Sequence, residues 1–239
     1  MKKILLVGSQ HGDERLGDKL IRRIKLYHPS LMVHVDFYLA NPKAHRLNKR
    51  YIESDMNRSF SSNQDSYEAI RAKKLLAKIK ASNYDLVLDL HTTTDKTESF
   101  FIVPAEHSET VNDFLKISPI IKIVAMRHKI IETSLIGNVN HALSVEASIQ
   151  LIDKDFLELL IESLEKYLHS DVPVNATKEL FYVDMLIDKA SYTPAQFQRM
   201  KNFERFEYNF YPILIRSRSY RKYTNYRGFG ATIKLTKSI

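Results

Sequence analysis

The sequence contains no cysteine, so disulfide bonds and thiolate metal sites are excluded. It also lacks any apolar run near the roughly 20 residues that a membrane-spanning helix needs. Only four strongly apolar residues follow Met1-Lys2-Lys3 before the first glycine, which is too few for the core of a signal peptide. Internal repeats and low-complexity tracts are absent. These absences indicate an ordinary globular protein without a membrane partner, for which the cytoplasm is the expected compartment.

The excess of positive over negative charge comes from one part of the chain. The 239 residues include 36 Lys/Arg and 28 Asp/Glu, which gives a net charge of +8. From Arg199 onward there are ten Lys/Arg against only two acids, Glu204 and Glu207, and this difference equals the whole excess. The basic character therefore belongs to a C-terminal segment, whereas the first 198 residues are balanced.

Apolar segments rich in branched residues alternate with segments of helical periodicity. This order predicts an α/β fold with a mostly parallel, mixed sheet flanked by helices. Expected strands cover residues 4–7, 32–39, 86–90, 100–103, 120–125 and 142–145, and expected helices cover residues 16–27, 66–81, 109–117 and 153–168. Near residue 172 the helical pattern ends, and segments rich in tyrosine and phenylalanine follow. This change predicts a main domain of residues 1–172 and a small β-rich C-terminal domain of residues 173–239. Expected strands in the latter cover residues 180–187, 208–215 and 231–236.

Ligand-capable side chains follow two of the expected strands. His11 and Glu14 come just after the first strand, in "GSQHGDERLG", and His91 ends another, in "YDLVLDLH". In open α/β sheets the ligand crevice lies beyond the carboxyl ends of the strands, so these residues are expected at one edge. Two histidines and a glutamate, with a fourth position left for water, are the ligand set of a catalytic zinc site. Taken alone, each residue fits an ordinary hydrogen-bonded side chain better than a metal ligand, and the case for ligands depends on the motifs that accompany them.

Further motifs accompany these residues along the chain. A long aperiodic segment reads "NPKAHRLNKRYIESDMNRSF" (residues 41–60), "DLHTT" covers residues 89–93, and "SVEAS" covers residues 144–148. A loop that long inside a compact domain is usually functional. Together with the H-G-D-E run, these motifs resemble the succinylglutamate desuccinylase/aspartoacylase family, relatives of the zinc carboxypeptidases, and are closest to those of the aspartoacylases. "YPILIRSRSYRKY" (residues 211–223) also resembles an aspartoacylase tail, so the resemblance covers nearly the whole chain.

The resemblance implies one zinc ion per chain and a catalytic set around it. His11, Glu14 and His91 match the zinc ligands. Glu146 matches the general base that takes a proton from water and later passes it to the leaving amine. Arg50 matches the arginine that, with zinc, stabilises the oxyanion of the tetrahedral intermediate.

Four further residues match positions that bind substrate or support the metal. Asn57 and Arg58 match the pair that binds the α-carboxylate of the substrate, a task that suits the planar fork of arginine. Asp55 matches the carboxylate that orients His11 from outside the metal site. Tyr220 aligns with a tyrosine that reaches into the substrate pocket. The seven other histidines match no motif and are expected to be structural or surface residues.

The departures from the family pattern concern substrate choice. Ala-Ser-Ile-Gln (residues 147–150) follows Glu146 where aspartoacylases have Val-Gly-Pro-Gln. No arginine lies near Ile136, where aspartoacylases place one for the side-chain carboxylate of their substrate. Ser217 stands where a glutamate is expected, and the C-terminal domain is shorter. The resemblance therefore implies a zinc-dependent amidohydrolase of a small anionic N-acyl amino acid, with the acyl group and side chain left open.

Two alternatives remain open at this point. Zinc carboxypeptidases share the ligand set, so a peptidase that acts on C-terminal residues is one alternative. The other is a non-catalytic protein that binds nucleic acid or another anion through the basic, tyrosine-rich C-terminal segment. We favour the interpretation that this segment frames the pocket and attracts an anionic substrate, because Tyr220 lies within it. Nucleic acid is then not expected as a partner, and the sequence leaves a homo-oligomer open.

Overall fold

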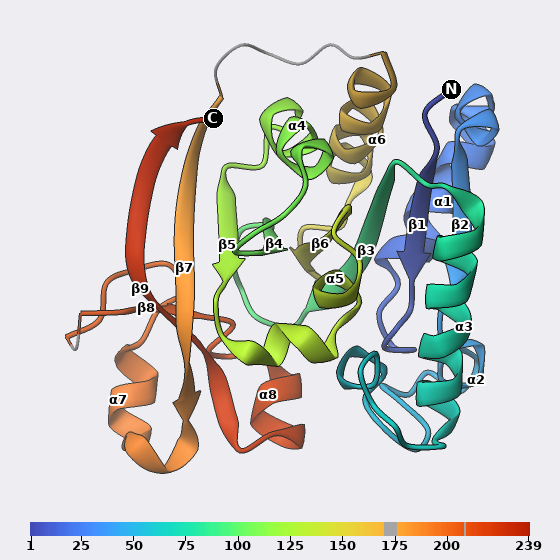
Figure 1. The fold of residues 1–239 in the computed structure, drawn as a ribbon. Coiled ribbons are helices and arrows are strands. Elements are labelled where there is room, and N and C mark those ends of the chain that lie inside the picture. The colour runs from blue at the N-terminus through green and yellow to red at the C-terminus, as the bar shows by residue number, and fades with distance from the viewer. Residues whose placement is uncertain (170–175, 208) are drawn as a thin grey trace.

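The computed structural model describes residues 1–169, 176–207 and 209–239. These residues form a nine-stranded mixed sheet in the order β2-β1-β3-β6-β4-β5-β7-β9-β8 (Figure 1). Helices cover both faces of the sheet. The predicted fold class, a mostly parallel mixed sheet flanked by helices, is therefore confirmed.

The first four strands in this order run parallel to one another and carry the sequence motifs. They are β2 (Val35–Leu39), β1 (Ile4–Gly8), β3 (Leu86–Thr93) and β6 (Ala142–Ser148). All five residues of β1 are buried, because neighbouring strands and helices on both faces enclose it. The carboxyl ends of β1, β3 and β6 consequently meet at one edge of the sheet.

The direction of the sheet reverses at its centre. β4 (Phe100–Pro104) pairs antiparallel with β6 and parallel with β5 (Lys122–Met126), and β5 pairs parallel with β7 (Thr177–Asp188). β9 (Tyr226–Ser238) pairs antiparallel with β7, and the short β8 (Tyr211–Ile213) pairs antiparallel with β9. The sheet thus joins the parallel block β2-β1-β3-β6 to the parallel block β4-β5-β7, which runs in the opposite direction, and β4 and β6 form the seam. β9 and β8 extend the second block by antiparallel pairing.

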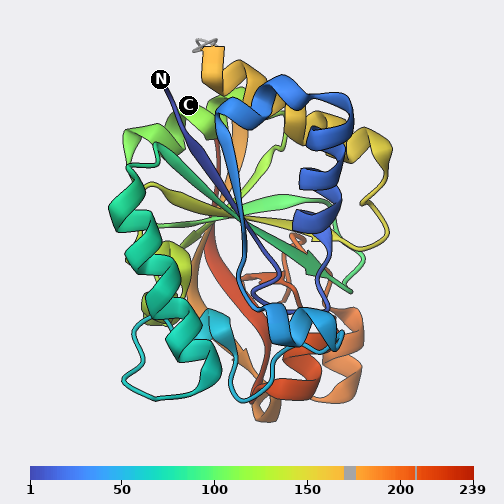
Figure 2. The ribbon, with the colours of Figure 1, turned by 90° about the vertical axis from the view of Figure 1, so that its right-hand side faces the viewer.

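Two layers of helices enclose the sheet, as Figure 2 shows. One layer holds α1 (Leu16–Tyr27), α4 (Glu109–Ile117) and α6 (Lys154–His169), and the other holds α3 (Tyr67–Ser82) and α5 (Leu135–Asn138). Leu6 and Leu88 pack into the hydrophobic cluster of the first layer, whereas Leu5 and Val87 pack into that of the second. This alternation follows from the two-residue period of a strand.

Short helical segments fill the connections. They are α2 (Pro42–Arg46), α7 (Pro194–Arg199), α8 (Arg218–Tyr223) and the 3₁₀ turns η1 (Pro29–Val33), η2 (Met56–Arg58), η3 (Lys129–Thr133) and η4 (Lys189–Ser191). The predicted strand at residues 32–39 is wrong at its start, because Pro29 opens a 3₁₀ turn that extends to Val33. None of the helices in the described residues is both long and apolar enough to cross a membrane.

The predicted domain boundary between residues 172 and 173 lies outside the described residues, as does the first residue of the predicted strand 208–215. On either side of that boundary the chain contributes to the same sheet, because β7 pairs with β5. Phe181 packs with Phe100 of β4, whereas Phe206 and Phe210 belong to a cluster made only of residues after β7 has begun. The division into two domains stays a prediction.

Candidate metal centre and active site

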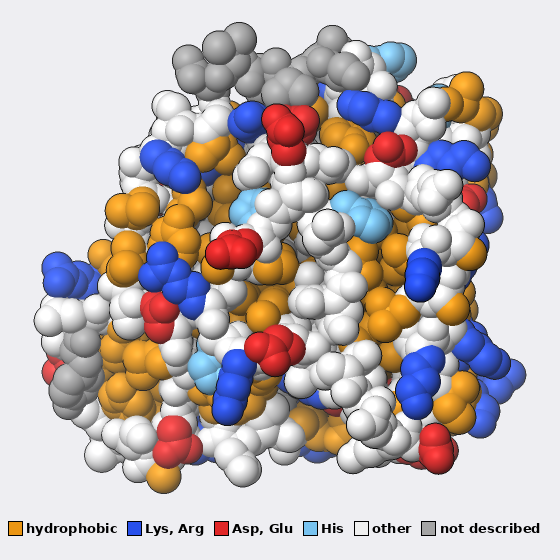
Figure 3. Space-filling view, viewed as in Figure 1, with side chains coloured by type: hydrophobic (Ala, Val, Ile, Leu, Met, Phe, Trp, Pro, Cys, Tyr) orange, Lys and Arg blue, Asp and Glu red, His pale blue; other side chains and the backbone are white. Residues whose placement is uncertain are grey.

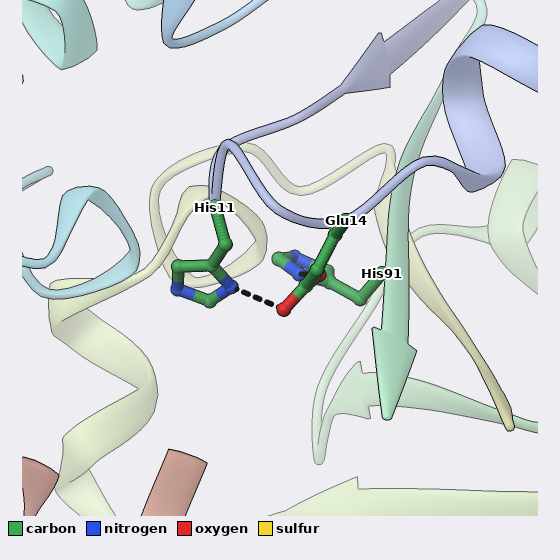
Figure 4. Close-up of side chains that lie close together, drawn as sticks. All are labelled: His11, Glu14 and His91. Carbon is green, nitrogen blue, oxygen red and sulfur yellow. Dashed lines mark hydrogen bonds and ion pairs between the residues drawn. The ribbon is translucent and has the colours of Figure 1, made fainter. Parts of the chain in front are cut away.

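His11, Glu14 and His91 meet at the carboxyl ends of β1 and β3. The carboxylate of Glu14 lies between the two rings, with Oε1 2.7 Å from His11 Nδ1 and Oε2 3.0 Å from His91 Nδ1. One ligand atom from each residue lies within 4.8 Å of the others, and all three residues are buried. Figure 4 shows His11 and Glu14 on the loop that follows β1 and His91 on β3. The structure thus brings together the three predicted ligands.

Each imidazole is held from its far side by a second carboxylate. His11 Nε2 lies 3.0 Å from Asp55 Oδ1, and His91 Nε2 lies 2.8 Å from Asp89 Oδ2. Metal-binding histidines commonly have such a partner, which fixes the ring so that its other nitrogen faces the ion. Asp55 lies where its predicted role requires. Asp89 was missed, although its spacing of two from His91 puts both side chains on one face of the strand.

The buried histidines and carboxylates of this cluster shift one another's pKa values. Burial alone would lower the pKa of His91, but the Asp89 and Glu14 carboxylates raise it well above its ordinary value. Burial would raise the pKa of Glu14, but the His11 and His91 imidazoles hold it well below its usual range. The carboxylates of Glu14 and Asp89 therefore favour positive charge at the imidazoles. A divalent cation fits this donor set, because on binding it replaces the imidazole protons.

Glu146 lies beside His91, its partner in the register of β6 and β3. It is half-buried and lines a pocket together with His91, Arg58 and Tyr220. Burial raises the pKa of Glu146 to about 7, so its carboxyl group gains and loses a proton near neutral pH. The predicted general base thus neighbours the predicted ligands, and its catalytic role stays a prediction.

Arg50 reaches the same cluster from the long loop. Its Nη2 donates to Asp55 Oδ2 at 2.9 Å, and its Nη1 donates to Ser219 Oγ at 2.8 Å and lies 3.5 Å from Glu14 Oε1. Its Nε is buried and has no hydrogen-bond partner among the described residues. Buried donors are rarely left in that state, so this N–H is available to a ligand.

Asn57 and Arg58 line the pocket that contains Glu146, and so does Tyr220. Arg58 Nη1 donates to Asn57 O at 2.7 Å, and Nη2 donates to the hydroxyl of Tyr226 at 3.1 Å. Each of these nitrogens carries two hydrogens, and each donates one of them to another described residue. The second hydrogen on each nitrogen is available to a ligand. Asn57 Oδ1 is buried and likewise lacks a partner within those residues. The N–H groups that Arg58 has left suit a carboxylate, whereas Asn57 Oδ1 is an acceptor and calls for a donor.

A wider cleft opens on the other side of Glu14. Its volume is about 520 Å³, and its walls combine the N-terminal loops with α8. Lys49, Arg50, Arg218 and Lys222 line it, against the acids Asp13 and Glu14. Arg218 and Lys222 belong to the basic C-terminal segment, so part of the charge excess borders the candidate metal centre.

Glu68, which sequence reasoning missed, organises the loop that supplies Arg50 and Asp55. Its side chain is fully buried on α3. It accepts hydrogen bonds from the side chain of Asn41 and from the backbone N–H groups of residues 52–54, at 2.7–3.2 Å. The sequence around Glu68 indicates only a helix that begins after the N-cap Ser66. It does not reveal the role of Glu68, because its partners lie 14 to 27 residues earlier in the chain.

Glu68→Ala is expected to lower the free energy of unfolding by about 3 kcal/mol, because four buried bonds to a carboxylate are lost. Amide hydrogen exchange in residues 41–63 should become faster than in the rest of the chain. Denaturant unfolding and exchange mass spectrometry test this, with Glu162→Ala, an exposed glutamate of α6, as the control. Unchanged protection of residues 41–63 in Glu68→Ala would contradict the role given to Glu68.

Comparisons with known proteins agree with the geometry. The family model described as "Succinylglutamate desuccinylase/Aspartoacylase catalytic domain" matches residues 1–131. The chain is 37% identical over 107 residues to a probable aspartoacylase of Nostoc sp., a match that covers 39% of this chain and 36% of the relative. It is also 37% identical over 117 residues to an N-acyl-aromatic-L-amino acid amidohydrolase of Xenopus tropicalis, covering 43% of this chain and 37% of the relative.

These matches span little more than a third of the length of either relative. Among solved structures, murine aminoacylase 3 superposes with a TM-score of 0.73 at 19% identity, covering 100% of this chain and 98% of the other. At that identity the likeness concerns the fold alone. The fold is therefore shared over the whole chain, and the sequence match lies in the N-terminal part that contains His11, Glu14 and His91.

Proposed function

Since the chain belongs to the succinylglutamate desuccinylase/aspartoacylase family, we propose that it is a zinc-dependent amidohydrolase that removes the acyl group from a small N-acyl amino acid. The observation that carries the proposal is the buried convergence of His11, Glu14 and His91 beside Glu146. A zinc ion held by these three side chains would supply Lewis-acid chemistry, making water acidic near neutral pH and polarising the acyl carbonyl.

Glu146 is the general base of the proposed reaction. Its carboxylate accepts a proton from the attacking water and then delivers that proton to the nitrogen of the leaving amine. Both steps need a group that is close to the metal centre and can exist in either protonation state. The position of Glu146 beside His91, on a buried strand, supports this assignment.

Two arginines bind different negatively charged groups of the substrate. Arg50, whose buried Nε has no partner among the described residues, stabilises the oxyanion that forms on the carbonyl. Arg58 and Asn57 bind the α-carboxylate in the pocket that Glu146 lines, and Tyr220 closes that pocket. Asp55 takes no part in the chemistry; it orients His11 and Arg50.

The basic C-terminal segment is proposed to attract anionic substrate rather than nucleic acid. Arg218 and Lys222 line the cleft next to Glu14 and Arg50, where positive charge raises the local concentration of anions. On the face seen in Figure 3, Lys and Arg side chains are scattered among acidic ones. In the cleft itself the basic side chains lie beside the acids Asp13 and Glu14, whereas a groove that follows a nucleic-acid backbone would be lined by uninterrupted positive charge.

The reaction class is tested by amine release from N-acetyl, N-succinyl and N-formyl amino acids, with and without a zinc chelator. We expect turnover of at least one compound that the chelator abolishes and added zinc restores. Tripeptides serve as the matched comparison, and the compact pocket predicts that they are poor substrates. Hydrolysis of tripeptides as fast as N-acyl amino acids would favour the peptidase alternative.

A further inference from the structure

The pocket beside Glu146 is polar at one end and apolar over the rest of its wall. The polar end is formed by Asn57, Arg58 and Tyr220 together with Glu146 itself. The remaining wall comes from β4, β5, β9 and the segment between β5 and β6. Its apolar side chains are Ile102, Met126, Ile130, Ile131, Ile136 and Phe229.

The amino-acid side chain of the substrate has to lie against this apolar wall. In the proposed function Arg58 binds the α-carboxylate, and the α-carbon carries both that carboxylate and the side chain. Arg58 lines the pocket of Glu146 but not the wider cleft beside Glu14. The side chain therefore occupies the pocket, and the acyl group is directed toward the metal centre and the wider cleft.

An acidic side chain would find no positively charged partner there. Among the described residues that line the pocket, Arg58 is the only arginine or lysine, and the α-carboxylate occupies it. The two serine hydroxyls of the wall already donate elsewhere, Ser134 Oγ to Ile131 O at 2.6 Å and Ser144 Oγ to Asp89 Oδ2 at 3.2 Å. A second carboxylate would thus be buried without a charge partner and near Glu146, which is strongly unfavourable.

An aromatic side chain would be too large. The cavity volume of this pocket is about 40 Å³, whereas a cavity that holds benzene measures about 150 Å³. The wall is also held tightly, because a Cβ atom on Gly137 would lie only 2.0 Å from Ile131 O. η3 and α5 are therefore in direct backbone contact, and Ile136, which is 3% exposed, cannot withdraw without separating them.

We propose that the site accepts the smallest uncharged side chains, above all that of alanine, and excludes both acidic and aromatic ones. The proposal rests on the function proposed above for the position of the α-carboxylate. It separates this chain from the substrates in the names of its relatives, which are aspartate and aromatic amino acids. Ile136, Met126 and Ile131 are then the residues that set specificity.

The test compares kcat/KM of the zinc-loaded protein for N-acetyl-L-alanine, -valine, -leucine, -aspartate and -phenylalanine. The best aliphatic substrate is expected to exceed N-acetylaspartate by at least about a hundredfold and N-acetylphenylalanine by at least about tenfold. Ile136→Ala, which enlarges the cavity, should raise kcat/KM for N-acetylphenylalanine about tenfold and leave N-acetylaspartate poor. Ile70→Ala, at an exposed position of α3, is the matched control and should change nothing.

Preference of the wild-type protein for N-acetylaspartate or N-acetylphenylalanine would overturn the proposal, whether or not Ile136→Ala folds. If none of the five compounds is hydrolysed but an N-succinyl or N-formyl amino acid is, the comparison is repeated with that acyl group. If no N-acyl amino acid is hydrolysed, the proposed function fails, and the affinities of the same five compounds, measured by calorimetry, test the side-chain preference of the pocket on their own. Tighter binding of N-acetylalanine than of the acidic and aromatic compounds would then support the inference. Equal or reversed affinities would overturn it.

Discussion

Glu146→Gln is expected to reduce kcat about a thousandfold or more and to leave the bound metal in place. Glutamine has nearly the same shape as glutamate but cannot accept the proton of the attacking water, and general acid–base groups contribute roughly 10²–10⁴ in rate. The melting temperature should not fall, because burial raises the pKa of Glu146 from 4.5 to about 7, so that its ionisation removes stability as the pH rises between these values, and glutamine does not ionise. Steady-state kinetics and metal analysis on the same preparation test the prediction.

Glu162→Gln, with the same chemical change at an exposed position of α6, is the control and should keep normal turnover. Normal turnover in Glu146→Gln would show that another group takes the proton, and the mechanism proposed here would be wrong. Loss of both metal and turnover would instead indicate that Glu146 supports the metal centre.

Removal of zinc by a chelator is expected to abolish turnover and to lower the melting temperature. A ligand at about a thousand times its Kd stabilises the folded state by about 4 kcal/mol. For a protein of this size that corresponds to a rise of about 8–16 °C in melting temperature. The reason is local. Three carboxylates, those of Glu14, Asp55 and Asp89, lie around two buried imidazoles. Without a cation, their negative charge is balanced only by hydrogen bonds, among them that of Arg50 to Asp55, and by protons on the imidazoles.

His91→Ala tests whether that stabilisation arises at the proposed ligands. It should eliminate the zinc-dependent rise in melting temperature and turnover together, whereas His169→Ala, at an exposed position at the end of α6, should change neither. Differential scanning fluorimetry across a zinc titration gives the first readout. A full zinc-dependent shift in His91→Ala would place the metal elsewhere.

The regular elements were predictable because each carries its own local signal. α1 and α4 begin and end at the predicted residues, since their apolar residues keep a helical period and Ser108 accepts the hydrogen bond of an N-cap from Val111 N. The antiparallel seam of β4 and β6 was not predictable, because the apolar pattern of a buried strand is the same in both directions. α7 and α8 have six residues each, too few to establish a period.

The site was predictable where its residues follow strands or belong to motifs. His11, Glu14 and His91 converge because β1 and β3 are parallel neighbours, as the rule that ligand sites lie beyond the carboxyl ends of strands in α/β sheets predicts. Asp89, Glu68 and the apolar wall of the pocket lie outside any motif. Glu68 accepts hydrogen bonds from residues 14 to 27 positions earlier, and Asp89 accepts one from the side chain of Gln10, 79 positions earlier. Only the folded chain brings these partners together.

The long loop and the C-terminal segment meet at the candidate active site. Arg50 donates to Ser219 on α8, and Arg58 donates to the hydroxyl of Tyr226 at the start of β9. The candidate metal ligands and Glu146 all lie within the first 150 residues, whereas both of these partners lie more than 60 residues further along the chain. The positions of the two substrate-binding arginines thus depend on a part of the chain that contributes none of the candidate metal ligands.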